Sequence, residues 1–338
     1  MYAANKPGQL SFDTELPMLT INRQLCASFV LLVIVMMSGC GSRDSSGDLD
    51  RPVIGVSLLT TTNPFFNVLG ESIRSSAEKY GYEVVLTSGD LDVNRQKNQV
   101  SDFIVRGVNA IVLTPVDSRS IATAIREAND AGIPVFTADV AVLNSTVKVV
   151  CHVATDNYQA GEMAAVAMIE ALGGEGQVGI VDYPEVESVM LRTRGFFDEL
   201  ERNQQETGKE ITVVARLNGG GQKDRGFRVG QDMIQAHPGL RGIFAINDPS
   251  ALGAVAALEE AEREDDIVVV SIDGQPEGKQ AIKDGKIFAD AVQYPERIGE
   301  QTVDVIMRYM NGEAVPSEIL ISTSLYKNED AVADSTLH

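Results

Sequence analysis

Short runs of β-branched and other apolar residues alternate along the chain with longer segments in which apolar residues recur every three or four positions. The alternation begins at Pro52 and predicts strands that each lead into a helix, as in a parallel sheet with crossover helices. The predicted strands are Val53–Leu59, Glu83–Thr87, Ala110–Thr114, Val135–Ala138, Val149–Val153, Gln177–Val181, Thr212–Arg216, Gly242–Ile246, Val268–Ile272 and Ile287–Val292. The predicted helices include Phe65–Tyr80, Arg95–Arg106, Ile121–Ala131, Gly161–Leu172, Gln222–Ala236 and Ala251–Ala261.

The series of strands and helices restarts after Val153 with a second, similar series. Ten strands could form one large sheet, but two doubly wound lobes account better for the restart. A chain of 338 residues is long enough for two domains of ordinary size. We therefore predict an α/β protein of two lobes, each built around a parallel sheet.

The beginning of the chain has the pattern of an export signal. A basic residue precedes the apolar run 27–37, and two small residues then lead into Cys40. The run is too short to cross a bilayer as a helix, which takes about 20 residues. Residues 1–17 contain two acidic side chains, unlike a basic leader, so translation could instead start at Met18.

The sequence Met37-Ser38-Gly39-Cys40 resembles a bacterial lipobox, in which the cysteine is lipidated and becomes the first residue of the mature chain. Met37 stands where leucine is more usual. The alternative is a plain cleaved signal in which Cys40 carries no lipid. We interpret residues 1–39 as a lipoprotein signal peptide, and the small, polar segment 40–51 as a flexible tether.

Charge and cysteine content argue against several classes of function. A formal net charge of −20 opposes binding to the phosphate backbone of nucleic acids. With Cys40 lipidated, the mature chain keeps only Cys151, so no internal disulfide can form. Cys151 and His152 do not make a catalytic pair, because neighbouring residues on a strand point to opposite faces. We expect Cys151 to be a buried structural thiol.

Several short segments resemble phosphate-binding or metal-binding motifs, but they lack the flanking elements or residues that such sites require. Residues 174–179 satisfy Gly-x-Gly-x-x-Gly, yet they lead into a predicted strand instead of leaving one for a helix. Segment 90–101 begins like a calcium loop but lacks the required glycine and the bidentate glutamate. The three histidines are far apart in the sequence. We therefore expect no metal, no cofactor and no catalytic activity.

Polar residues recur where the predicted strands end. In doubly wound sheets, ligands bind beyond the carboxyl ends of the strands. The residues found there are Asn63, Thr114, Asp139, Asp182, Asn247 and Asp273. Each alone is more often a turn or helix-cap residue. Their recurrence at equivalent ends, with almost no lysine, indicates recognition of hydroxyl groups rather than of phosphate.

Several motifs resemble, in order, those of the ribose-binding family of periplasmic proteins. The first is Thr61-Thr62-Asn63-Pro64-Phe65-Phe66, which leads into a predicted helix. The others are Thr114-Pro115-Val116-Asp117-Ser118, Gly132-Ile133-Pro134-Val135, Ala154-Thr155-Asp156-Asn157, Arg192-Thr193-Arg194-Gly195-Phe196, Ala245-Ile246-Asn247-Asp248, Ala251-Leu252-Gly253-Ala254, Ile272-Asp273-Gly274 and Gln293-Tyr294-Pro295. The likeness covers nearly the whole chain after the tether.

The resemblance implies a Venus-flytrap protein, in which two lobes joined by three chain crossings close on a solute. By this likeness lobe one holds residues 52–154 and 294–322, and lobe two holds residues 155–293 and 323–338. The hinge crossings would lie near Ala154, Gln293 and Thr323. Repressors of the lac type share this fold, but they carry a helix-turn-helix where this chain has its predicted export signal.

The resemblance also assigns ligand contacts to positions of this chain. They are Asn63, Phe65, Phe66, Asp139, Arg192, Asn247, Asp273 and Gln293. Thr114 is a ninth candidate, at a position where the family usually has asparagine. Aromatic faces cover the apolar side of a sugar ring, carboxylates accept from hydroxyls, and arginine donates to them. One of Phe65 and Phe66 could instead be a core residue, and Arg192 could instead form a surface ion pair.

Two further positions depart from the family's ribose pattern. Val140 replaces an arginine, and Gly221 lies close to where an aromatic residue closes the far side of the ring. Tyr183 or Phe227 could refill that space. Together with Thr114, these departures argue against ribose. They favour a different aldose, a ketose or a sugar alcohol, and leave room for a hexose or a substituted sugar.

The resemblance implies a solute-binding protein that captures a monosaccharide or related polyol and delivers it to the permease of an ABC-type sugar importer. The expected protein is an exported monomer of the periplasm or cell envelope, held to a membrane through lipid on Cys40 only. The alternative is a sensory protein that presents its sugar to a chemoreceptor or sensor kinase. An enzyme acting on sugars is a third class, which product analysis would detect.

Overall fold

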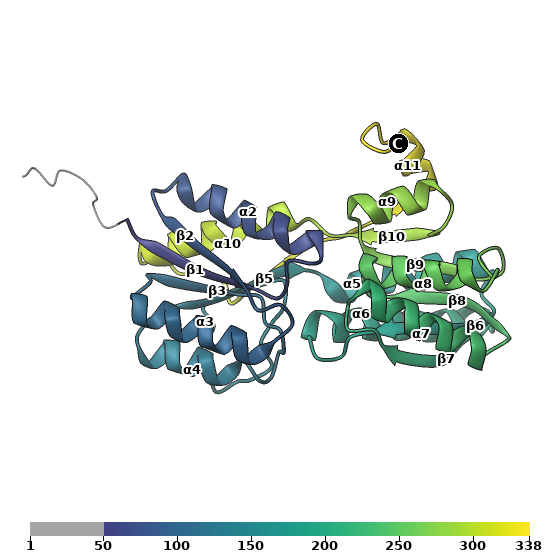
Figure 1. Ribbon diagram of the computed structural model, residues 1–338, viewed down its shortest axis with the longest axis horizontal. Coiled ribbons are helices and arrows are strands. Elements are labelled where there is room, and N and C mark those ends of the chain that lie inside the picture. The colour runs from purple at the N-terminus through teal and green to yellow at the C-terminus, as the bar shows by residue number, and fades with distance from the viewer. Residues whose placement is uncertain (1–50) are drawn as a thin grey trace, which may run out of the picture. The chain divides into compact units, whose positions relative to one another are not determined.

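The computed structural model describes residues 51–338, which form two α/β lobes, each around its own six-stranded sheet (Figure 1). This confirms the predicted fold class. The predicted signal peptide, the lipidation site Cys40 and the tether up to residue 50 lie outside the described residues.

Lobe one is the set of elements around the first sheet, whose strand order is β11-β5-β4-β3-β1-β2 and whose strands are all parallel. Its strands are β1 (Val53–Leu58), β2 (Glu83–Ser88), β3 (Ala110–Leu113), β4 (Val135–Ala138), β5 (His152–Thr155) and β11 (Glu318–Ile321). Its helices are α2 (Pro64–Glu78), α3 (Val93–Arg106), α4 (Ala122–Asp130) and α10 (Pro295–Met310).

Lobe two surrounds the second sheet, of order β12-β10-β9-β8-β6-β7, which is parallel except that β12 runs antiparallel to β10. Its strands are β6 (Gly176–Asp182), β7 (Ile211–Asn218), β8 (Leu240–Ala245), β9 (Val268–Asp273), β10 (Ala289–Val292) and β12 (Ser324–Lys327). Its helices are α5 (Asn157–Leu172), α6 (Glu187–Thr207), α7 (Lys223–Ala236), α8 (Asp248–Glu260), α9 (Pro276–Lys283) and α11 (Asn328–Ala333).

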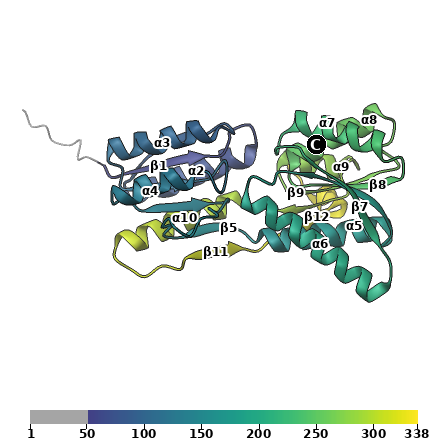
Figure 2. The same ribbon diagram turned by 90° about the horizontal axis from the view of Figure 1, so that it is seen from below.

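The chain passes between the two sheets three times. It leaves lobe one after β5, returns from β10 to α10, and leaves again between β11 and β12. Strands β11 and β12 were not among the predicted elements, because they are only four residues long and half-exposed. Each extends the edge of a different sheet, and Figure 2 shows β11 beside β5.

The sheet of lobe one is buried on both faces, as crossover helices require. Alternate residues of β3 point to opposite faces: Ala110 and Val112 pack with α2 and α10, whereas Ile111 and Leu113 pack with α3 and α4. The Phe103 ring of α3 lies over Gly55 of β1, where a Cβ atom would come within 2.6 Å of the ring. Glycine there lets α3 lie close against the sheet.

The structure corrects several predicted boundaries, and capping explains two of the corrections. Helix α5 begins four residues before the predicted Gly161, because Asp156 accepts a hydrogen bond from the Gln159 amide at 3.0 Å. Helix α8 begins at Asp248 rather than Ala251, because Asn247 caps it in the same way. The strand predicted at 149–153 is β5, which begins only at His152.

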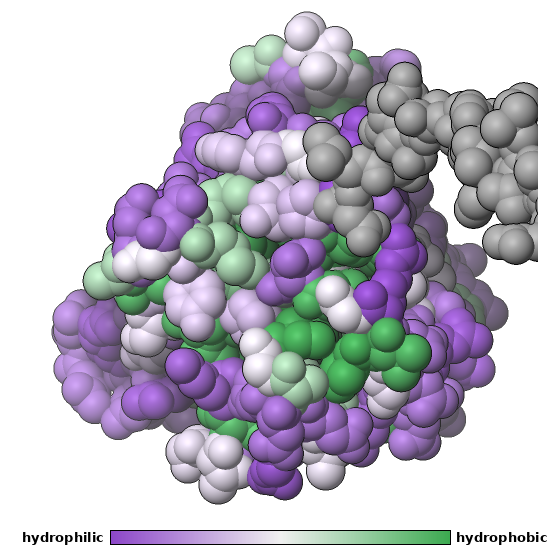
Figure 3. All heavy atoms as spheres, turned by 90° about the vertical axis from the view of Figure 1, so that its left-hand side faces the viewer, coloured by the Kyte–Doolittle hydropathy of each residue, from purple (hydrophilic) through white to green (hydrophobic). Residues whose placement is uncertain are grey.

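Most of the molecular surface seen from the lobe-one end is hydrophilic, with hydrophobic side chains gathered near its middle (Figure 3). Between residues 51 and 338, none of the helices is long and apolar enough to cross a membrane.

Candidate functional site

A cavity between the lobes is lined by residues from both of them. Its volume is about 500 Å³, including its opening to solvent. Eight of the nine ligand contacts expected from the sequence line it. They are Asn63, Phe65, Phe66, Asp139, Arg192, Asn247, Asp273 and Gln293. Asn63, Asp139 and Asn247 follow strands, and Asp273 ends β9. Phe65 and Phe66 lie in the first turn of α2, Arg192 lies in α6, and Gln293 lies in the crossing between β10 and α10.

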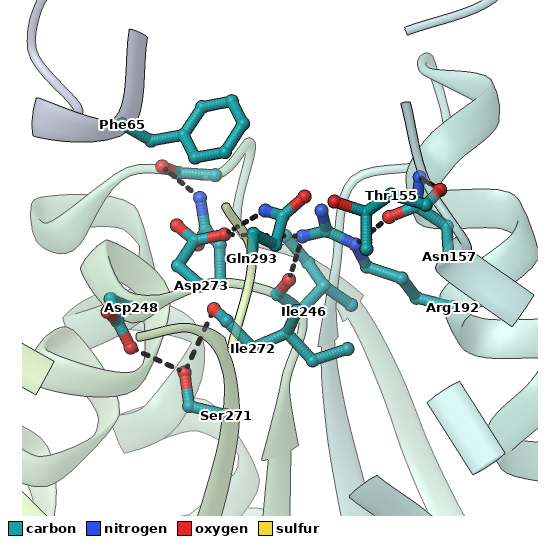
Figure 4. A network of polar contacts seen from close by, with 12 residues as sticks. Phe65, Thr155, Asn157, Arg192, Ile246, Asp248, Ser271, Ile272, Asp273 and Gln293 are labelled. Carbon is teal, nitrogen blue, oxygen red and sulfur yellow. Dashed lines mark hydrogen bonds and ion pairs between the residues drawn. The ribbon is translucent and has the colours of Figure 1, made fainter. Parts of the chain in front are cut away.

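Asp273 lies at the centre of the polar contacts in this cavity (Figure 4). Its Oδ2 atom accepts a hydrogen bond from Nδ2 of Asn63 at 3.0 Å, and its Oδ1 atom accepts one from Nε2 of Gln293 at 2.7 Å. Arg192 Nη1 lies 3.5 Å from the same Oδ1 atom. Asn63 belongs to lobe one and Asp273 to lobe two, so one of these contacts crosses the cavity.

Arg192 is buried, with 4% of its side chain exposed, and is therefore not a surface ion pair. Its Nε atom donates to Oδ1 of Asn157 at 2.7 Å, and Nη1 donates to the Ile246 carbonyl at 2.7 Å. A Cβ atom at Gly161 of α5 would come within 1.9 Å of the Arg192 carbonyl oxygen. Glycine therefore allows α5 and α6 to pack closely enough to fix the backbone that carries Arg192.

Asp139 follows β4 with a positive φ of 65° and is almost fully buried. Its Oδ1 atom has no hydrogen-bond partner within the described residues, so it is free to accept one from a solute. Burial raises the pKa of Asp139 to about 7, Arg192 opposes this rise, and Asp273 and Glu187 add to it. The Asp139 carboxyl therefore changes charge near neutral pH.

Two asparagines reach the cavity because they cap helices. Asn63 caps α2 through Oδ1, which accepts from the Phe65 amide at 2.9 Å. Asn247 caps α8 through Oδ1 and donates from Nδ2 to the Gly221 carbonyl at 3.2 Å. The same two side chains thus cap a helix and line the cavity, so a capping role is compatible with contact to a ligand.

Aromatic and aliphatic side chains form the apolar part of the wall. The rings of Phe65 and Phe66 meet edge to face at 5.1 Å, and both rings are buried in the core as well as lining the cavity. From lobe two, Tyr183 lines the cavity next to Gly221. A Cβ atom on Gly221 would lie 3.6 Å from Cδ1 of Tyr183. Of the two residues considered for this position, Tyr183 lines the cavity and Phe227 does not.

Thr114 and Asp182 lie away from the cavity. Thr114 is fully buried, and its carbonyl accepts from Nε2 of Gln96 at 2.9 Å. The Asp182 carboxylate binds Arg216 and accepts from Thr193 Oγ1 at 3.1 Å. Thr114 was expected to contact the solute, and we leave it out of the proposed contacts because it is fully buried and does not line the cavity.

Cys151 and His152 are both buried, and burial keeps both side chains uncharged. Burial raises the pKa of Cys151 to about 11, so the thiol is neutral, and burial lowers the pKa of His152 to about 4. The His152 Nδ1 atom pairs with Thr137 Oγ1 at 2.9 Å. Within residues 51–338, no cluster of three or more histidine, cysteine, aspartate or glutamate side chains could hold a metal ion.

Three hydrogen bonds next to the cavity join the lobes and were missed by the sequence analysis. The Ser118 amide donates to the Glu185 carbonyl at 3.1 Å, and Ser118 Oγ accepts from the Glu187 amide at 2.9 Å. Tyr183 Oη donates to the Val116 carbonyl at 3.2 Å. We call these three contacts the latch. The motif containing Ser118 was recognised, but its partners are about 70 residues away and no local pattern pairs them.

A pair of buried carboxyl groups, Asp248 and Asp290, lies behind Asp273. Asp248 accepts from the Gln275 amide at 2.7 Å and from Ser271 Oγ at 3.0 Å. Asp290 is fully buried beside it, and burial raises its pKa to about 6. Burial and the neighbouring Asp290 also raise the pKa of Asp248, because ionisation of both buried carboxyl groups is unfavourable.

Comparisons with known proteins find relatives over most of the chain. The ribose import binding protein RbsB of Bacillus subtilis is 32% identical over 276 residues, covering 81% of this chain and 87% of the relative. A solute-binding protein from Bacillus halodurans with bound myo-inositol is 27% identical with a TM-score of 0.76, covering 84% and 96% of the two chains. The fructose-binding periplasmic domain of a hybrid two-component system has a TM-score of 0.77 at 22% identity, covering 83% and 92%.

A sequence profile described as "Periplasmic binding protein domain" matches residues 54–314, which include nearly all of both sheets and every residue that lines the cavity. The protein is therefore a member of the periplasmic binding protein family, of the ribose-binding-like type I class.

Proposed function

We propose that this protein captures a neutral monosaccharide or related polyol between its lobes and delivers it to the permease of an ABC-type sugar importer. The observation that carries the proposal is the set of groups around the cavity. Asp139 and Asp273 provide hydrogen-bond acceptors, Arg192 provides a buried donor, and Phe65 and Phe66 provide an apolar surface. The hydroxyls of a sugar can bind both the acceptors and the donor, and its C–H face can pack on the aromatic rings.

The charges that line the cavity support an uncharged solute. They are Asp139, Arg192 and Asp273, so carboxyl groups outnumber the single cation. Arg192 is already engaged by Asn157, Ile246 and Asp273, which leaves little positive charge for an anion. A phosphorylated sugar would meet two buried acids, and their repulsion makes it a poor ligand.

Closure of the lobes explains how the solute is retained. Hydrogen bonds that cross between the lobes, such as Asn63 to Asp273, need both lobes in contact. A solute bound by Asp139 from one lobe and Arg192 from the other favours this arrangement, because it contacts both sides only when they are close. No group in the proposal does chemistry on the sugar, and incubation followed by product analysis checks this.

Ribose is not expected to be the best ligand. Val140 lines the cavity as an apolar side chain and supplies no donors beside Asp139. A site without these donors favours a solute that does not need them. The expected ligand is a different aldose, a ketose or a sugar alcohol. Tyr183 lines the cavity beside Gly221 and takes up part of the room that a glycine at this position would leave for a hexose.

We also propose that the protein is exported and is held at the membrane of the periplasm or cell envelope through lipid on Cys40. The apolar run followed by two small residues and Cys40 supports this. We propose that it works as a monomer without nucleic acid, metal or cofactor. The sensory alternative would use the same cavity and would differ only in the protein that docks on the outer surfaces.

The first experiment is a thermal-shift screen of pentoses, hexoses, ketoses and polyols, followed by calorimetry on the hits. A ligand of the folded state raises its stability by about 2.7 kcal/mol at a hundred times its dissociation constant. We expect at least one sugar or polyol to bind and ribose not to give the largest shift. Uptake of the labelled ligand by cells with and without the gene then distinguishes import from sensing. Failure of every compound would refute the proposed function.

A further inference from the structure

Valine side chains line the cavity beside the charged groups of the site. They are Val140 of lobe one and Val186 and Val189 of lobe two, and each is at most 4% exposed. We call these residues the valine wall. Val140 directly follows Asp139, and Val189 precedes Arg192 by three positions, which is close to one helical turn. Both of these charged side chains therefore have a valine next to them in the lining of the cavity.

Ser118 joins the two segments that carry the valine wall. The Leu143 amide donates to the Ser118 carbonyl at 2.7 Å, which holds the loop that begins at Val140. Ser118 Oγ accepts from the Glu187 amide at 2.9 Å, which holds the turn at Val186. The valines of the two lobes are thus brought to one part of the cavity through a single residue.

Val186 occupies a position where a polar residue is usual. It is the N-cap of α6 and makes no side-chain capping hydrogen bond, whereas Asn63 and Asn247 cap α2 and α8 at the same cavity. Valine is among the poorest N-cap residues, so α6 lacks a hydrogen bond that the other two helices have. Sequences break such local rules mainly at functional sites. The feature gained at Val186 is an apolar surface facing the cavity.

The valine wall offers no side chain that forms hydrogen bonds. Ser188 also lines the cavity, but it is two positions from Val186 and one from Val189, so it lies on a different side of the helix. A solute hydroxyl that meets the wall loses its bound water and gains no side-chain partner, which is unfavourable. A methyl or methylene group at the same place buries apolar area instead, which is favourable.

The wall is available for a substituent at the edge of a sugar ring. Phe65, Phe66 and Tyr183 already provide apolar surface for the C–H faces of the ring. The hydroxyls that bind Asp139 and Arg192 lie at the ring's edge, and the valines are next to these two residues. Because Tyr183 also limits the room, a sugar with one oxygen atom fewer is the better fit.

We propose that the solute is a deoxy sugar, in which a methyl or methylene group stands where the parent sugar carries a hydroxyl. This group packs against the valine wall, while the remaining hydroxyls bind Asp139, Arg192 and Asp273. The inference rests on the proposed function, because it names the class of sugar that the same cavity takes.

Calorimetry on the full folded protein compares sugars in pairs that differ by one oxygen atom. The pairs are D-fucose with D-galactose, L-fucose with L-galactose, L-rhamnose with L-mannose, 6-deoxyglucose with glucose and 2-deoxyribose with ribose. Every other sugar found in the wider screen is compared with its own deoxy forms. We expect a deoxy sugar to bind roughly tenfold or more tightly than its partner, because an apolar wall leaves the extra hydroxyl unpaired.

The outcomes separate this inference from the proposed function. If sugars bind and no deoxy form binds more tightly than its hydroxylated partner, the inference is overturned and the proposed function stands. If no sugar or polyol of either kind binds, both proposals fail.

A threonine in the valine wall should reduce the preference. Val140→Thr replaces a methyl group by a hydroxyl at nearly the same volume, so the wall gains a hydrogen-bonding group. The preference for the deoxy sugar should fall roughly threefold or more, as expected for one ordinary hydrogen bond. Val186→Thr makes the same change from lobe two and serves if Val140→Thr does not fold. Val105→Thr is the matched control, because this valine of α3 is 89% exposed, and it should keep the parental preference. An unchanged preference in both wall variants would show that the wall does not select the sugar.

Discussion

Asn63 and Asp273 are 210 positions apart in the chain, yet Nδ2 of Asn63 donates to Oδ2 of Asp273 across the cavity at 3.0 Å. Asn63 caps the first helix of lobe one, and Asp273 ends β9 of lobe two with a positive φ of 140°. The contact therefore ties the start of one helix to a strained strand end of the other lobe. The contact joins the two lobes, and both residues line the cavity.

Replacing Asp273 should weaken ligand binding strongly. Loss of a buried charged hydrogen bond costs about 2–5 kcal/mol, so Asp273→Ala should raise the dissociation constant by roughly 30-fold or more at about 1.4 kcal/mol per decade. Calorimetry with the ligand found in the screen measures the change. Asp266→Ala, which removes an exposed carboxylate of the same lobe, is the control and should bind like the parent. A folded Asp273→Ala variant with parental affinity would show that Asp273 is not a contact.

Removing the side-chain part of the latch should favour the open arrangement of the lobes. Ser118→Ala deletes the Oγ atom that accepts from the Glu187 amide, and one such hydrogen bond contributes about 0.5–1.5 kcal/mol. The apparent affinity falls in proportion to the closed fraction, so we expect a loss of roughly 2- to 12-fold. Small-angle X-ray scattering without ligand should show a larger radius of gyration.

The neighbouring exposed serine provides a control for the latch. Ser120→Ala makes the same chemical change two residues away, outside the contact between the lobes. It should alter neither the apparent affinity nor the radius of gyration. An unchanged affinity and radius of gyration in Ser118→Ala would mean that the latch does not influence closure.

The buried pair Asp248 and Asp290 should make stability depend on pH. The folded-state pKa of Asp290 is raised from 3.8 to about 6, so the folded protein holds this proton more tightly than the unfolded chain. Its contribution is fully present below about pH 4 and is lost as pH rises to about 6. A shift of this size corresponds to roughly 3 kcal/mol at about 1.4 kcal/mol per pKa unit.

Asp290→Asn removes the titrating group while keeping its shape. Urea unfolding at pH 4.5 and pH 7.5 should show a smaller fall in stability with rising pH for this variant than for the parent. Asp139 also has a raised pKa and remains in both proteins, so the difference between them isolates the pair. Asp284→Asn, an exposed change, should follow the parent. Identical pH profiles for the parent and Asp290→Asn would contradict a raised pKa for Asp290 in the folded protein.

Cys40→Ser should release the exported protein from the membrane or leave it unprocessed, because serine cannot carry the thioether-linked lipid. Fractionation of cells followed by mass spectrometry of the N-terminal residue measures this. Cys151→Ser is the matched control, because Cys151 is buried in the folded chain and follows the predicted signal peptide by more than 100 positions in the sequence. A water-soluble parent protein whose first residue carries no lipid would count against the lipobox.

The sequence alone determined the fold and most of the polar groups of the site. Periodicity identifies strands and helices because burial on both faces of a parallel sheet leaves a continuous apolar run. The same topology fixes where the strands end, so Asn63, Asp139, Asn247 and Asp273 were recognised from their positions after strands. Arg192 and Gln293 were predicted as ligand contacts from the ordered family motifs, because their positions after strands alone would not identify them.

Only the tertiary structure decided which of these residues meet and which do not. Thr114 and Asp182 lie at strand ends just as Asp139 does, yet neither lines the cavity, since Thr114 is fully buried and Asp182 pairs with Arg216. Local sequence carries no information about such partners, because they come from other elements. For the same reason the latch and the buried pair Asp248 and Asp290 depend on how distant segments are brought together by packing of the helices on the sheets.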